Sequence, residues 1–311
     1  MNRAFIFPGQ GSQKIGMAKD FYDSFAVAKD VFECVNDTLG YDLSKIIFEG
    51  PDDELASTTN TQPALMATSI AIFRVLTQET GKNIEELCDV VAGHSLGEYS
   101  ALCASDSLSL EETAKLLKVR ATSMQKASPK GEGAMAACIG ISFKDLNDVL
   151  ESLITDGVCQ IANDNVDGQI VISGHEYNVD RIVAALKDTG YKAIKLKVSA
   201  PFHSKLIESA QKPMQSALDS TEIKTSKVPL LANVTADLVS DPNTIKKNLV
   251  TQISGTVRWR ETMDKFAKLG ITELVEIGSG KVLSGLAKKT PYNFKLSSIS
   301  NIEELKNYID S

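Results

Sequence analysis

A serine flanked by two glycines is the residue in this chain best suited to chemistry. The stretch Gly93-His-Ser-Leu-Gly97 fits G-x-S-x-G, the sharp strand-to-helix turn called a nucleophile elbow. So tight a turn needs neighbours without a Cβ, and it lifts the hydroxyl of Ser95 clear of the sheet. It also directs the next backbone N–H, that of Leu96, toward an oxyanion. The pattern predicts a catalytic Ser95; an ordinary glycine-flanked turn is the alternative.

A serine hydroxyl needs a base to take its proton, and the chain has three histidines. His94 adjoins the nucleophile and points elsewhere if Ser95 is at the apex of the turn. His175 follows a predicted strand, in a turn that we expect to be exposed. His203 lies where the chain returns from a predicted inserted domain, and loops at such junctions line clefts. We therefore predict His203 as the general base, with a helix-capping or surface histidine as the alternative.

Arg120 is a candidate anchor for a substrate. The spacing predicts a helix over 110–126 whose apolar face runs through Ala114, Leu117, Ala121 and Met124, and Arg120 lies beside that face. A long cation in this position commonly extends to water. The alternative is a bidentate pair with a substrate carboxylate, which a guanidinium suits better than an ammonium.

The sequence offers no pattern for a metal or a cofactor. Gly9-Gln-Gly-Ser-Gln-Lys14 has a lysine where the dinucleotide motif needs its last glycine, and Val282 follows Lys281 where a phosphate-binding loop needs serine or threonine. The five cysteines are scattered without C-x-x-C, which is typical of reduced thiols in the cytosol. We expect the glycine-rich loop at 8–13 to bring backbone N–H groups close to a ligand instead.

Composition limits the class of protein. The 311 residues carry 33 basic and 40 acidic side chains, a net charge of −7, which argues against a nucleic-acid partner. There is no 18-residue apolar run and no signal-peptide core at the start, so neither a membrane span nor a membrane partner is expected. The chain is therefore predicted to be a cytoplasmic protein.

The order of predicted elements indicates two domains. Strands alternate with helices over 1–128 and 199–311, which predicts a large α/β domain with a mostly parallel sheet. Among its predicted elements are helices over 20–39 and 205–218 and strands over 228–234 and 273–277. Between them, residues 129–198 follow the order β-α-β-β-α-β of a ferredoxin-like unit. We therefore expect a small ferredoxin-like domain inserted into the large one.

Several motifs then appear together in one order along the whole chain. They are Phe7-Pro-Gly-Gln-Gly-Ser-Gln13, Asn60-Thr-Gln-Pro-Ala64, Gly93-His-Ser-Leu-Gly-Glu98, Arg120, Ala200-Pro-Phe-His203 and Glu276-Ile-Gly-Ser-Gly-Lys281. In this combination the chain resembles the malonyl-CoA:acyl carrier protein transacylases of type II fatty-acid synthesis. One departure is Ser279, where members of that family often have proline.

The resemblance implies a hydrolase-like α/β fold and a role for each matched residue. Ser95 would be acylated, and His203 would act first as base and then as acid. Backbone N–H groups of Gln10 and Leu96 would form the oxyanion hole, and Arg120 would hold the malonyl carboxylate. The carbonyl of Gln252 would orient the histidine in place of a carboxylate.

Other matched positions imply contacts with the substrate. Gln62 and Asn165 would lie at the cleft, without a chemical role assigned to them. Phe202 would select malonyl over methylmalonyl groups, because an aromatic ring there leaves little room for a branch methyl; a methyl group is worth only about 1–3 kcal/mol of discrimination.

The resemblance also implies the reactants. Malonyl-CoA would acylate the serine, and the phosphopantetheine thiol of acyl carrier protein would take the acyl group over. No metal or other cofactor would be needed, and a monomer is expected. The alternatives are a discrete acyltransferase of polyketide synthesis, a serine hydrolase or thioesterase that uses water as acceptor, and a non-enzymatic scaffold.

Overall fold

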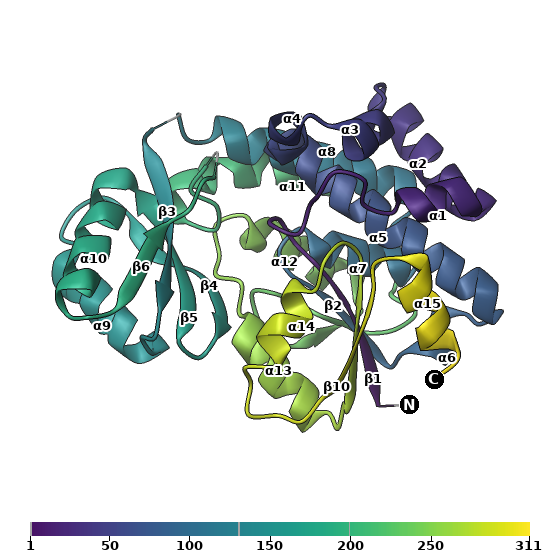
Figure 1. Ribbon diagram of the computed structural model, residues 1–311. Coiled ribbons are helices and arrows are strands. Elements are labelled where there is room, and N and C mark those ends of the chain that lie inside the picture. Colours follow the sequence, from purple (N-terminus) through teal and green to yellow (C-terminus); the bar gives the residue numbers. More distant parts are fainter. Residues whose placement is uncertain (1, 130, 199) are drawn as a thin grey trace.

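The computed structural model describes residues 2–129, 131–198 and 200–311, in which two separate β-sheets form. The larger sheet has the strand order β10-β9-β1-β2-β7-β8, and the smaller has the order β4-β5-β3-β6. Figure 1 shows the smaller sheet and its helices beside the larger unit. All pairings in the larger sheet are parallel except that of β7 with β8. The predicted α/β class with a mostly parallel sheet is therefore confirmed.

The strands of the larger sheet come from both ends of the chain. They are β1 (Arg3–Phe7), β2 (Val90–Gly93), β7 (Leu230–Leu231), β8 (Leu238–Val239), β9 (Glu273–Ile277) and β10 (Lys295–Ile299). Side chains alternate along a strand, so Phe5 and Phe7 of β1 enter the core on one face of the sheet whereas Ala4 and Ile6 enter the core on the other. The central strand is thus buried on both faces, as is usual for a parallel sheet.

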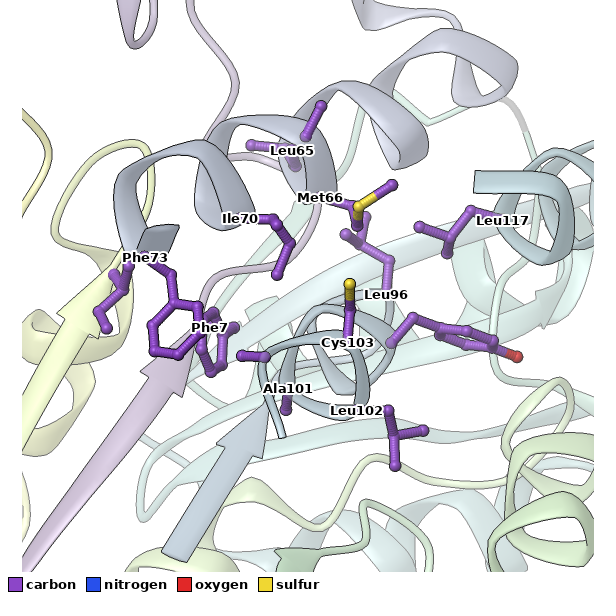
Figure 2. Packing of buried hydrophobic residues seen from close by; sticks show 14 of the residues in the cluster. Phe7, Leu65, Met66, Ile70, Phe73, Leu96, Ala101, Leu102, Cys103 and Leu117 are labelled. Atoms are coloured by element: carbon purple, nitrogen blue, oxygen red, sulfur yellow. The ribbon is translucent and has the colours of Figure 1, made fainter. Parts of the chain in front are cut away.

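Helices cover both faces of this sheet. Helix α5 (Thr58–Thr80) is buried over most of its length, and it packs against α2 (Ala26–Leu39), α7 (Gly97–Ala104) and α8 (Leu110–Lys126). Figure 2 shows side chains of α5, among them Phe73, directed toward Phe7 of β1 and toward α7. On the opposite face, α13 (Trp259–Lys268) and α14 (Val282–Ala287) supply Trp259 and Leu283 to a second apolar core. The remaining helices of this unit are α1 (Lys19–Ser24), α3 (Leu43–Glu49), α4 (Asp52–Ala56), α6 (Ile84–Leu87), the 3₁₀ helix η1 (Lys205–Ala210), α11 (Gln211–Asp219), α12 (Pro242–Gln252) and α15 (Ile302–Ile309).

The smaller sheet has the ferredoxin-like arrangement. Its elements are β3 (Gly133–Ile139), α9 (Phe143–Leu153), β4 (Cys159–Val166), β5 (Gln169–His175), α10 (Glu176–Asp188) and β6 (Lys192–Lys195). All its strand pairs are antiparallel, and the predicted order β-α-β-β-α-β is confirmed. Residue 199, where we expected the chain to re-enter the large domain, lies outside the described residues, as do residues 1 and 130.

Three element predictions differ from the structure. The helix predicted over 20–39 is two helices, because Phe25 is extended (φ −129°, ψ 122°) between α1 and α2. The helix predicted over 205–218 begins as the 3₁₀ helix η1. The strand predicted over 228–234 is reduced to β7, because the chain turns back between Ala232 and Asp237 to form β8. Among the described residues, no helix combines the length and the apolar character that crossing a membrane requires.

Candidate active site

The turn between β2 and α7 has the geometry of a nucleophile elbow. Ser95 has φ 54°, in the left-handed region that residues with a Cβ rarely adopt. A Cβ added to Gly93 would lie 1.9 Å from the carbonyl oxygen of Gly97, and one added to Gly97 would lie 2.2 Å from that of Phe7. Only glycine therefore allows β2 and α7 to approach each other and β1 so closely. The structure agrees with the turn predicted from the sequence.

Asn233 holds the elbow from behind, and sequence reasoning missed it. Its Oδ1 accepts a hydrogen bond from the Ser95 backbone N–H (2.7 Å), and its Nδ2 donates to the carbonyl of Gly93 (2.7 Å). One amide side chain thus satisfies backbone groups on both sides of the strained turn. The sequence carries no signal for this role beyond a polar residue after a short apolar run.

Ser95, His203 and Gln252 form a continuous chain of hydrogen bonds. Ser95 Oγ lies 2.7 Å from His203 Nε2, and His203 Nδ1 lies 2.8 Å from the backbone carbonyl oxygen of Gln252. A carbonyl oxygen only accepts, so Nδ1 carries the proton and Nε2 offers its lone pair to the serine hydroxyl. Burial, with Arg120 as the next cause, lowers the pKa of His203 to about 3. The imidazole is therefore neutral at physiological pH, as a general base must be.

Arg120 does not extend to water; its side chain is 1% exposed. Nη1 donates to Oε1 of Gln62 (2.7 Å), and Nη2 donates to Oε1 of Gln252 (2.9 Å) and to Ser95 Oγ (3.0 Å). Its guanidinium carbon lies 5.6 Å from the centre of the Tyr99 ring. Burial lowers the pKa of Arg120 from its ordinary value, but a guanidinium stays protonated. A cation is thus held beside Ser95 by neutral amide oxygens, and no carboxylate among the described residues forms an ion pair with it.

These residues border a cavity between the two sheets. Its volume of about 210 Å³ is below the roughly 300 Å³ at which pockets for drug-sized ligands begin, so a small acyl group fits it. It is lined by most of the predicted site residues: Gln10, Ser95, Leu96, Arg120, Asn165, Phe202 and His203, together with Gln62. Gln252 is the exception, because its side chain is fully buried behind the cavity and contacts Arg120 there. Gln252 was grouped with the substrate-binding residues through the resemblance, but its side chain supports the site from outside the cavity lining and its backbone carbonyl contacts His203.

Gln10 and Leu96 line this cavity, and their backbone N–H groups have no partner within the described part of the chain. Among the hydrogen bonds between described residues, none has the N–H of Gln10 or of Leu96 as donor. The loop that carries Gln10 approaches the elbow closely, because a Cβ on Gly9 would lie 2.5 Å from the carbonyl oxygen of His94. The glycine-rich loop therefore lies beside the elbow at the cavity wall, and contact of its N–H groups with a ligand stays a prediction.

The two histidines that we did not choose as base have other partners. His94 Nε2 lies 2.8 Å from Oδ1 of Asn165, so that ring connects the elbow to β4 of the smaller domain. His175 was expected to be exposed in a turn, but it is half-buried as the last residue of β5, and its Nδ1 accepts the N–H of Val158 (2.8 Å), directly before the neighbouring strand β4. In the part of the chain that the structure describes, no group of three or more His, Cys, Asp or Glu side chains could hold a metal ion.

Comparison with known proteins defines the class. Residues 4–299 match the family described as acyl transferase domain, which covers both sheets and the whole site. In this chain, the acyl transferase domain therefore contains the mostly parallel sheet with its serine elbow and the smaller antiparallel sheet.

Individual relatives narrow this class. The malonyl CoA-acyl carrier protein transacylase of Bacillus subtilis is 43% identical over 305 residues, which cover 97% of this chain and 95% of that protein. The transacylase of the same name from Staphylococcus aureus is 38% identical over 307 residues, covering 98% and 97%. The crystal structure of the acyl-carrier-protein S-malonyltransferase from Bartonella henselae matches with a TM-score of 0.97 at 48% identity, covering 100% of this chain and 99% of that one.

A further solved structure contains a partner. It is a malonyl-transacylase in complex with a holo type II polyketide synthase acyl-carrier protein, and it matches with a TM-score of 0.95 at 35% identity over 99% of each chain. With these relatives, the chain belongs to the malonyl-CoA:acyl carrier protein transacylase family of acyl transferases. The resemblance drawn from the sequence motifs is confirmed.

Proposed function

We propose that this protein transfers the malonyl group of malonyl-CoA to the phosphopantetheine thiol of acyl carrier protein. One observation carries the proposal: the same oxygen, Ser95 Oγ, is 2.7 Å from an imidazole nitrogen and 3.0 Å from a buried guanidinium. A base beside the serine supports acyl transfer in general, whereas a buried cation favours an acyl group with its own negative charge.

The first half-reaction acylates the serine. His203 takes the hydroxyl proton through Nε2 while Oγ attacks the thioester carbonyl, and the Gln252 carbonyl keeps the ring in the required tautomer. The N–H groups of Gln10 and Leu96 stabilise the negative oxygen of the tetrahedral intermediate. One such donor is typically worth about 2.7–4 kcal/mol. The thiol of CoA leaves with the proton from His203, and malonyl-Ser95 remains.

The second half-reaction reverses these steps with a different thiol. His203 takes the proton of the phosphopantetheine thiol, the thiolate attacks malonyl-Ser95, and the serine leaves with the proton. The relative that was solved with its carrier protein supports a carrier as acceptor, and the relatives named after acyl carrier protein support fatty-acid synthesis as the setting. We further propose that the chain works as a cytoplasmic monomer without a cofactor.

Arg120 supplies the selectivity for malonyl in this proposal. The substrate carboxylate would be the first anion to contact a guanidinium that is 1% exposed and has only neutral hydrogen-bond acceptors. An acetyl group cannot provide that contact, and a site built for a polar group strongly rejects an analogue that lacks it. Phe202, 7% exposed at the cavity wall, would limit a branch on the acyl chain.

The test is the intact mass of the protein after mixing with malonyl-CoA. The parent chain should gain the mass of one malonyl group, the Ser95→Ala variant should gain none, and phosphopantetheinylated carrier protein should remove the group from the parent. Rapid release of free malonate in the absence of carrier would show a hydrolase instead. A parent chain that gains no mass and releases no malonate would reject the proposal altogether.

A further inference from the structure

A buried carboxylate lies one helical turn beyond the nucleophile and does not reach the cavity. Glu98, in the first turn of α7, is 1% exposed and is not among the residues that line the cavity. Burying a carboxylate is costly unless hydrogen bonds compensate it. Here Oε2 accepts a hydrogen bond of 2.6 Å from Nε2 of Gln252 and one of 3.2 Å from the backbone N–H of Asn233. Both donors belong to residues that hold the site from behind.

The Gln252 amide has one favourable orientation, and Glu98 is the charged and nearest of the three acceptors that favour it; the others are the Ser95 carbonyl and Oδ1 of Asn233 (3.3 Å). Nε2 donates to Glu98 and to the carbonyl of Ser95 (3.0 Å), while Oε1 accepts from Arg120 (2.9 Å). A flipped amide would place its oxygen against a carboxylate and a carbonyl, and its NH₂ group against a guanidinium. The carboxylate therefore ensures that an acceptor faces the cation.

The path from Glu98 to the cavity is short and runs through one side chain. Glu98 contacts Gln252, Gln252 contacts Arg120, and Arg120 contacts Ser95 Oγ. Glu98 is also an anion close enough to Arg120 that each charge affects the other's pKa. It thus stabilises the buried cation without occupying the position that a substrate carboxylate would take.

From these contacts we propose that Glu98 is a positioning residue for malonyl selection: through the Gln252 side-chain amide it holds Arg120 in the acyl cavity beside Ser95. The inference rests on the proposed malonyl transfer and extends it to a residue outside the cavity. Its burial raises the pKa of Glu98 to about 7, so assays at about pH 8 examine the carboxylate form.

The experiment compares the acylation of Ser95 by malonyl-CoA and by acetyl-CoA in three variants. Glu98→Leu should lower kcat/KM for malonyl-CoA roughly 10- to 100-fold and that for acetyl-CoA much less, because losing the acceptor frees the Gln252 amide. Glu98→Gln should stay within a few-fold of the parent, because its amide oxygen can accept the same two N–H groups. Arg120→Met removes the anchor itself, so the change in its malonyl-to-acetyl ratio is the upper limit for the change expected in Glu98→Leu.

Gln252→Leu removes the side-chain amide that connects Glu98 to Arg120. His203 uses the backbone carbonyl of Gln252, so this substitution leaves that bond in place. If Glu98 acts through the amide, Glu98→Leu in the Gln252→Leu background should change the ratio less than twofold further. Gln252→Leu alone still provides the test if Glu98→Leu does not fold.

Glu273→Leu is the matched control. Glu273 is a carboxylate 7% exposed at the start of β9, where it pairs with Arg3 and Lys295 away from the cavity. This variant should lose stability without changing the malonyl-to-acetyl ratio. An unchanged ratio in Glu98→Leu and Gln252→Leu, or a Glu98→Gln as impaired as Glu98→Leu, would overturn the inference. A parent chain that malonyl-CoA does not acylate would instead refute the proposed function.

Discussion

Ser95 and His203 share an unusual backbone conformation as well as a hydrogen bond. Their φ angles are 54° and 57°, both in the left-handed region. A residue with a Cβ is strained there, and such strain persists only where the surrounding contacts enforce it. Asn233 provides this enforcement at Ser95, and the Gln252 carbonyl fixes the ring of His203. The reactive geometry therefore depends on residues that never meet the substrate.

The charge state of His203 can be measured directly. Burial and the neighbouring Arg120 both disfavour the imidazolium, so the pKa is lowered to about 3 from an ordinary value near 6.5. In an NMR titration the His203 ring signal, assigned with the His203→Ala variant, should stay neutral from about pH 8 to pH 5. Arg120→Met removes one cause and should raise the pKa. An inflection near 6.5 in the parent would contradict this assignment of cause.

Close packing of α7 onto the sheet is the main feature at the scale of elements. The helix begins directly after the nucleophile, and its first residue, Gly97, lies against the backbone of β1. Helix α5 packs on α7 from the other side, and Figure 2 shows its Ile70 directed toward α7. The helix cannot move away to make room, so the elbow is held between a central strand and a buried helix.

Gly97→Ala should therefore lose stability. Its Cβ would lie 2.2 Å from the carbonyl oxygen of Phe7, which is main chain and cannot turn aside. We expect a loss of about 3 kcal/mol or more in the free energy of unfolding. Gly285→Ala in α14 is the control, because nothing lies within 4 Å of the added Cβ and alanine favours helix, for a gain of about 0.5–1 kcal/mol. Denaturant unfolding measures both; equal stability of the two variants would contradict the prediction.

At the scale of the whole molecule, strand β4 joins the two parts that enclose the cavity. Its middle pairs with the backbone of Val257 in the large domain, through the N–H of Asp164 (2.9 Å) and the carbonyl of Ala162 (2.8 Å). Asp164, 1% exposed, also pairs with Arg260 at 2.8 Å. Register shifts of β4 against β5 fall in this same segment, so the strand bends away from its own sheet to make these contacts.

Arg260→Leu should loosen this junction. It leaves the buried Asp164 carboxylate without its cation, and because Arg260 is itself 31% exposed we expect a loss of about 2 kcal/mol, below the 3–5 of a fully buried pair. Hydrogen exchange should increase in β4, and the KM for malonyl-CoA should rise. Lys144→Leu is the control, because the pair of Lys144 with Asp148 is largely exposed to solvent, which screens it. Equal exchange of β4 in both variants would show that the ion pair does not hold the junction.

Local patterns in the sequence were sufficient for the helix over 110–126, the strand Glu273–Ile277 and the elbow itself. These segments combine regular apolar spacing with clear end signals, so nearby residues specify them. Short elements were not predicted: α3, α4, α6, α15, β8 and β10. A helix of four to eight residues or a strand of two has too few turns or alternations to show a period, and packing stabilises it instead. Strand β10 (Lys295–Ile299) is as long as β9, but its sequence Lys-Leu-Ser-Ser-Ile has no continuous apolar run.

The same division applies to the site. The sequence by itself predicted Ser95 as nucleophile, His203 as base and Arg120 as the cation, because residue types at short spacings and the order of motifs indicate that chemistry; these roles stay predictions. Only the tertiary structure decided that Arg120 is buried, that Asn233 and Glu98 hold the site, and that Gln252 lies behind the cavity. These residues act through contacts between distant positions, such as Gln62 with Arg120, 58 residues apart, and Glu98 with Gln252, 154 residues apart, and no local pattern encodes such contacts.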